Sequence, residues 1–110
     1  MCKKRSLERS AFRMHLVVAE SKISALTDDQ QWAGEVSFSP VTPDSNHVVV
    51  ERVFVVPEFR HRGLASQLMA RFVQLAIAKQ WIIKIMCPYA KQYFKLHPEA
   101  QSVLLPQDRF

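Results

Sequence analysis

The chain has 110 residues, a length that fits one domain with a single hydrophobic core. Hydrophobic residues make up 48% of it and charged residues 23%, which excludes the disordered and fibrous classes. The formal net charge is +5, and residues 1–13 supply most of it. The rest of the chain is close to neutral in net charge, which disfavours a nucleic-acid-binding domain. We expect a flexible basic segment at residues 1–11, followed by one domain at residues 12–110.

The two cysteines, Cys2 and Cys87, form neither a disulfide framework nor a pair with metal-ligand spacing. His15 and His47 belong to no cluster of His, Cys and Asp, so we expect no metal site. The sequence shows no signal peptide and no apolar stretch long enough to span a membrane. These features predict a cytoplasmic protein without a membrane partner.

The first predicted elements are strands. Apolar and other residues alternate over 12–18, the period of a half-buried strand, and a second strand is predicted at Trp32–Phe38. The turn formers at Thr27–Gln30 predict that these two strands form an antiparallel hairpin. Pro40 and Pro43 predict a loop over residues 39–46.

A strand–helix–strand unit follows. His47–Val56 is rich in β-branched residues on both faces, which predicts a central strand covered on each side and ended by Pro57. Apolar residues then recur every three or four positions, which predicts an amphipathic helix over 64–79. A short strand at Trp81–Met86 implies a right-handed parallel crossover, and a second helix is predicted at Tyr89–Leu96. The fold class is therefore α/β, with a mixed, twisted sheet that begins with an antiparallel hairpin.

The turn before the first helix has the chemistry of an anion site. Gly63, one of only two glycines, lies where the strand passes into the helix. The first amides of a helix have no partner within it and carry the positive end of its dipole. A glycine lets a phosphate approach the backbone, and Arg60, His61 and Arg62 add donors beside it.

The spacing Val55-x-Pro57-x-x-Arg60-x-x-Gly63-x-Ala65 resembles the motif of the GNAT superfamily of N-acetyltransferases. The resemblance implies a minimal GNAT fold whose turn amides hold the pyrophosphate of acetyl-coenzyme A (acetyl-CoA). It also implies that the preceding strand pairs with the pantetheine arm. The cofactor-binding residues implied in this way are Phe54, Val55, Arg60, His61, Arg62, Gly63, Leu64, Ala65 and Ser66.

A second stretch, with Cys87-Pro88-Tyr89, Tyr93-Phe94 and His97-Pro98-Glu99, is similar to the short YjdJ-like or NATD-like branch of that superfamily. Many members carry Asn-x-x-Ala-x-x-x-Tyr after the crossover strand, with that Tyr as proton donor. Here the same spacing reads Cys87-x-x-Ala90-x-x-x-Phe94. Because Phe94 has no hydroxyl to donate a proton, the neighbouring Tyr93 is a candidate donor.

Two further residues are catalytic candidates. Cys87 precedes a helix, whose N-terminal amides favour a thiolate. It is a covalent acetyl carrier, a small residue lining the thioester pocket, or an inert buried cysteine. Glu51 is a base, a group that binds a cationic acceptor, or a surface carboxylate, and strand alternation predicts that Glu51 and Arg52 lie on opposite faces.

These features predict an enzyme that moves an acetyl group from acetyl-CoA to a primary amine. The alternative is an acyl-CoA-binding module or sensor with little turnover, which the departures from the motif favour. A third class, a nucleic-acid binder that uses the basic segment, would show strongly salt-dependent binding. The missing N-terminal helices of larger relatives imply an open acceptor surface, on a monomer or a weak homodimer.

Overall fold

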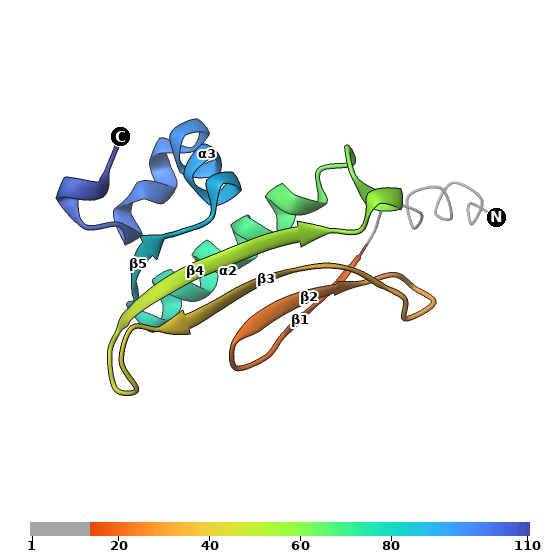
Figure 1. Cartoon of the computed structure of the whole chain (residues 1–110), viewed down its shortest axis with the longest axis horizontal. Coiled ribbons are helices and arrows are strands. Elements are labelled where there is room, and N and C mark those ends of the chain that lie inside the picture. The colour runs from red at the N-terminus through yellow and green to blue at the C-terminus, as the bar shows by residue number, and fades with distance from the viewer. Residues whose placement is uncertain (1–13) are drawn as a thin grey trace.

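The computed structural model describes residues 14–110 (Figure 1). The expectations for the basic segment 1–11, for Cys2 and for the start of the first strand at Phe12 lie outside the described residues. The strands are β1 (His15–Val18), β2 (Lys22–Leu26), β3 (Trp32–Pro40), β4 (His47–Val55) and β5 (Ile82–Ile85). The helices are α2 (Leu64–Lys79) and α3 (Pro88–Leu96), with 3₁₀ turns η1 (Pro57–Phe59), η2 (Pro98–Val103) and η3 (Pro106–Asp108).

The strands form one mixed sheet in the order β1-β2-β3-β4-β5. The pairs from β1 to β4 are antiparallel, and β4 and β5 are parallel neighbours joined through α2. This confirms the predicted α/β fold class. The bounds of α2 agree with the predicted helix, and α3 begins one residue earlier than predicted because Pro88 is accommodated in its first turn.

The pairing of the first hairpin was predicted wrongly. The turn at Thr27–Gln30 exists, but it joins β3 to β2, a strand that the sequence analysis missed. The first strand pairs with β2 instead of β3. Short β2 carries two apolar residues that face the core, Ile23 and Ala25, and the residues before it include no Gly or Pro to mark a turn.

Helix α2 covers one face of the sheet and contributes six buried residues to the core. It packs on β2, β3 and β4 and runs alongside β4 in Figure 1. Phe72 on α2 contacts Phe38 on β3 with ring centroids 4.9 Å apart, and both side chains are buried. Helix α3 follows β5 and contacts β4, β5 and α2. The two helices therefore bring their N-terminal ends toward the same region of β4.

Strand β4 differs from the prediction in two respects. It lies second from the edge of the sheet and not at its centre. A bulge interrupts its pairing with β3, because Ser37 pairs with Arg52 but Phe38 pairs with Val50, which leaves Glu51 as an extra residue.

The bulge also changes which side chains share a face. Glu51 accepts a hydrogen bond from Ser39 Oγ at 2.9 Å, and Arg52 contacts Glu35 at 2.8 Å. Residues 35 and 39 alternate onto the same face of β3, so Glu51 and Arg52 do not lie on opposite faces as strand alternation predicted. The expectation that β4 is covered on both sides is wrong here, since both residues are exposed.

Gly34 on β3 is required by a close approach of two strands. A Cβ at this position would lie 2.5 Å from the backbone oxygen of Phe54, which cannot move without disturbing the β3–β4 ladder. We expect Gly34→Ala to lower the free energy of unfolding by about 1–3 kcal/mol, the usual cost of forcing an atom into a packed interior. Urea denaturation measures this loss. The comparison variant is Ala33→Gly, which removes a Cβ at the neighbouring position instead of adding one. Unchanged stability of Gly34→Ala would contradict the geometry.

Candidate functional site

The site begins at an edge of β4 that no strand of residues 14–110 covers. The β4–β5 ladder ends where Val50 pairs with Ile85, and Met86 N–H donates to Val50 O at 3.2 Å. The chain then leaves the sheet to form α3, whereas β4 continues to Val55. Over residues 51–55, β4 therefore has a neighbour on the β3 side alone.

The exposed edge presents backbone groups at two positions. Val56 N–H donates to Ala33 O on the β3 side, so alternation directs the backbone of Val53 and Val55 to the other side. Val55 O on that side accepts a hydrogen bond from Arg60 Nε at 2.7 Å. An extended ligand can pair with the remaining groups as an added strand would.

The turn that follows β4 has a strained backbone. His61 and Gly63 both adopt positive φ, +65° and +80°. His61 occupies a conformation that costs a residue with a Cβ about 1–2 kcal/mol, and Gly63 avoids that cost. A Cβ on Gly63 would meet no protein atom within 4 Å. Open space, and not crowding within the protein, therefore lies in front of this glycine.

The amides at the start of α2 face this turn without partners. The first helical hydrogen bond runs from Gln67 N–H to Gly63 O at 3.0 Å, and no side chain caps the helix. Within residues 14–110, the N–H groups of Leu64, Ala65 and Ser66 have no acceptor. Free N–H groups at the positive end of a helix dipole favour an anion.

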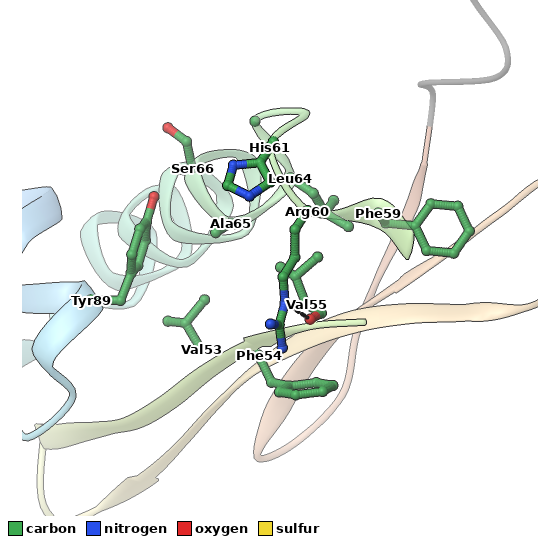
Figure 2. Close-up of a pocket in the computed structure, with 11 residues that line it drawn as sticks. Val53, Phe54, Val55, Phe59, Arg60, His61, Leu64, Ala65, Ser66 and Tyr89 are labelled. Atoms are coloured by element: carbon green, nitrogen blue, oxygen red, sulfur yellow. Dashed lines mark hydrogen bonds between the residues drawn. The ribbon is translucent and has the colours of Figure 1, made fainter. Parts of the chain in front are cut away.

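These elements enclose a pocket of about 470 Å³, which we call the strand–helix pocket (Figure 2). Its walls come from the end of β4, the turn, the first turn of α2 and the start of α3. It is lined by Val53, Phe54, Val55, Phe59, Arg60, His61, Gly63, Leu64, Ala65, Ser66 and Tyr89. Eight of the nine residues that the resemblance implied for the cofactor are in this lining. The exception is Arg62, whose guanidinium lies 5.9 Å from the Phe59 ring centroid.

Arg60 points inward, toward the strand. Besides its bond to Val55 O, its guanidinium lies 5.6 Å from the ring centroid of Phe54 (Figure 2). Arg52 approaches the same ring at 5.5 Å, and Trp32 stacks on it at 5.6 Å with an interplanar angle of 14°. Arg60 therefore ties the turn to the end of β4 and leaves the amides of α2 to meet an anion.

Tyr89 is a pocket residue that the sequence analysis did not assign to the site. It lies in the first turn of α3, is 37% exposed and faces the first turn of α2 across the pocket (Figure 2). Burial raises the pKa of Tyr89, and the nearby charge of Cys87 raises it further. The hydroxyl therefore stays protonated at neutral pH and can donate a proton.

The three predicted catalytic residues lie outside the lining of the strand–helix pocket. Tyr93 is buried and stacks on His97 with ring centroids 4.1 Å apart, and burial and Glu99 raise its pKa. Cys87 is the residue before α3 and is 7% exposed. Glu51 is exposed and bound to Ser39. The proximity of Cys87 to Tyr89 still places the thiol near the pocket.

In residues 14–110, no group of three or more His, Cys, Asp or Glu side chains is arranged to hold a metal ion. No helix in this part of the chain has the length and apolar character needed to cross a membrane.

The site thus combines a helix start whose first amides are free with an open strand edge. The sequence pattern of the family described as GCN5-related N-acetyl-transferase matches residues 23–103, which is most of the chain. The chain therefore belongs to the GCN5-related N-acetyltransferase (GNAT) family. A comparison with curated proteins finds no significant match.

Solved structures share the fold. A GCN5-like putative N-acetyltransferase from Staphylococcus aureus is 21% identical with a TM-score of 0.65, over 83% of this chain and 87% of the other. A ribosomal-protein-alanine N-acetyltransferase from Brucella melitensis biovar Abortus 2308 is 19% identical with a TM-score of 0.51, over 74% of this chain and 62% of the other. A putative acetyltransferase from Deinococcus radiodurans R1 is also 19% identical with a TM-score of 0.50, over 90% of this chain and 60% of the other.

Proposed function

We propose that the protein transfers an acetyl group from acetyl-CoA to a primary amine. The observation that carries the proposal is that one pocket contains both the free amides at the start of α2 and an uncovered edge of β4. Acetyl-CoA is an extended molecule with a pyrophosphate and an amide-containing arm, so both features have a counterpart in it. Family membership supports the same chemistry.

The residues present fit this cosubstrate. The N–H groups of Leu64, Ala65 and Ser66 would bind the pyrophosphate, which has room to approach because a Cβ on Gly63 would meet nothing within 4 Å. The backbone of Val53 and Val55 would pair with the amides of the arm. Acetyl-CoA supplies the acetyl group in activated form, as a thioester.

Tyr89 is the group we propose as proton donor. Transfer to an amine leaves a thiolate that must gain a proton, and Tyr89 carries the hydroxyl that α3 brings to the pocket. Its raised pKa keeps that proton available. Cys87 either forms the adjoining wall or carries the acetyl group covalently.

The acceptor would approach where β4 parts from β5. Glu51 is the first residue after the last β4–β5 pair, and its carboxylate is oriented by Ser39 on the face that also bears Arg52. We propose that Glu51 binds or deprotonates a cationic amine there. We also propose that the chain belongs to the short YjdJ-like or NATD-like branch, on the residues Cys87-Pro88-Tyr89 and His97-Pro98-Glu99 that carry that resemblance.

Acetyl-CoA binding is the first expected result. A ligand that binds only the folded state stabilises it by about 2.7 kcal/mol at a hundred times its Kd, which raises the Tm by several degrees. Thermal unfolding with acetyl-CoA, with dephospho-coenzyme A and without ligand measures this shift. Dephospho-coenzyme A lacks the ribose phosphate of coenzyme A but retains the pyrophosphate. We expect it to give most of the shift, because the Arg60 side chain is bonded to Val55 O and is not directed at the ribose phosphate. An unchanged Tm at millimolar acetyl-CoA would rule out the proposed site.

Turnover separates the enzyme from the alternative, a binding module or sensor. The absence of Tyr at position 94 is the observation that favours the module. Release of coenzyme A should rise when amines, amino-acid esters or peptides are added, above the background of acetyl-CoA hydrolysis. Tight binding without amine-dependent release would identify a sensor.

A further inference from the structure

A second pocket lies between the end of β5, the side of α3 and the last four residues of the chain. Its volume is about 410 Å³, and it shares no lining residue with the strand–helix pocket. We call it the C-terminal pocket, after its wall at residues 107–110.

The ionisable residues of the C-terminal pocket are mostly cationic. Lys84 comes from β5, Lys91 from α3 and Arg109 from the C-terminal segment, whereas Asp108 is the single acidic side chain in the lining. In the described part of the chain, neither lysine forms an ion pair or a hydrogen bond, and Asp108 pairs with none of the three cations. The pocket therefore holds positive charge that the protein does not neutralise.

Arg109 is held in a fixed orientation. Its Nε donates to Leu104 O at 3.1 Å and one terminal nitrogen donates to Ser102 O at 3.4 Å. A guanidinium has five N–H donors, so several remain for a ligand. An arginine already fixed by the protein loses less entropy when it binds a phosphate or carboxylate.

The wall formed by the C-terminal segment is anchored through a buried side chain. Gln101 is 7% exposed, donates to Phe94 O at 2.8 Å and accepts from Phe110 N–H at 2.9 Å. Lys95 on α3 lies 5.5 Å from the ring centroid of Phe110. The segment is thereby fastened to α3, so contacts within the fold hold this wall of the pocket in place.

We propose that the C-terminal pocket binds a small phosphate monoester. Lys84, Lys91 and Arg109 surround the phosphate, whose negative charge these cations complement. Ile85 and the half-exposed ring of Phe110 contact the apolar or planar group that the phosphate carries. The volume lies within the range of pockets that hold small metabolites. This binding is independent of acetyl transfer.

The test compares AMP, inorganic phosphate and adenosine by calorimetric titration in a buffer without phosphate. AMP should bind at one saturable site, phosphate more weakly, and adenosine not detectably. The double variant Lys84→Gln/Lys91→Gln should weaken AMP binding at least about tenfold, the effect of one lost charge-assisted hydrogen bond. Neither lysine makes a side-chain bond in the fold, so the variant should unfold like the parent.

Two controls locate the binding. Lys79→Gln removes an exposed lysine at the end of α2 and should leave AMP affinity unchanged. Gly63→Val alters the strand–helix pocket and should also leave it unchanged. Equal AMP affinity in the parent and the double lysine variant would overturn the proposal, as would equal weakening in Lys79→Gln. Loss of AMP binding in Gly63→Val alone would assign the phosphate to the start of α2.

Discussion

Gly63→Val is expected to weaken acetyl-CoA binding about a hundredfold or more. The new side chain would project into the space in front of the free amides of α2, where no protein atom lies within 4 Å. A displaced pyrophosphate would lose two or three charge-assisted hydrogen bonds, each of about 1.5–3 kcal/mol. Titration calorimetry measures the affinity.

The same variant should lose only moderate stability. The positive φ of Gly63 strains any other residue by about 1–2 kcal/mol, and a branched side chain somewhat more, but the added Cβ meets no neighbouring atom within 4 Å. Gln80→Val is the matched control, because Gln80 caps the other end of α2 with φ +58° and lies outside the pocket. The Gln80→Val variant should be less stable than the parent, with unchanged affinity for acetyl-CoA. Acetyl-CoA affinity that is the same in Gly63→Val and the parent would place the pyrophosphate elsewhere.

Tyr89→Phe is expected to lower kcat by about 10²–10⁴, the usual contribution of a general acid. The KM for acetyl-CoA should change little, because the ring still lines the pocket. Because burial raises the pKa of Tyr89, the parent keeps its proton donor at neutral pH and no loss of rate from this group is expected there. Initial rates at several pH values with the best amine acceptor measure these effects.

Tyr93→Phe is the matched control, since it removes the same hydroxyl one helical turn away, from a buried ring outside the pocket. Its kcat should remain near that of the parent. If Tyr93→Phe loses turnover and Tyr89→Phe does not, the expectation drawn from the sequence is correct and the assignment of Tyr89 is wrong.

Cys87→Ala distinguishes the two roles left open for the thiol. A covalent carrier would leave an acetyl mass on the Cys87 peptide when acetyl-CoA is supplied without amine, and Cys87→Ala would lose turnover. The low exposure of Cys87 and its absence from the pocket lining both disfavour a covalent carrier. We therefore expect no acetyl mass and near-normal turnover.

The sequence predicted the parts of the fold whose signals are local. The period of α2, the apolar run of β4 and the Gly63 turn each depend on residues close together in the chain. Most of the residues that the resemblance singled out at this turn lie together in the lining of the strand–helix pocket. Strand β2 was missed because five residues with no flanking Gly or Pro give almost no periodic signal.

The remaining features depend on how distant segments pack. The bulge at Glu51 arises from the register between β3 and β4, which the alternation within one strand does not encode. Tyr89 belongs to the pocket because the chain leaves β5 early and α3 begins opposite the first turn of α2. Tyr93 was a candidate because it neighbours Phe94, which occupies the position of the motif's Tyr, and its side chain is buried in the core.

The stack of Trp32 on Phe54 gives the protein a built-in optical probe. The indole is 42% exposed, and its partner ring is contacted by Arg60, which holds the end of β4 at the pocket. The second tryptophan, Trp81, packs against Phe38 at the start of β5 and can be removed as Trp81→Phe. Because indole emission responds to nearby charge and polarity, the remaining fluorescence would report occupancy of the strand–helix pocket without a label.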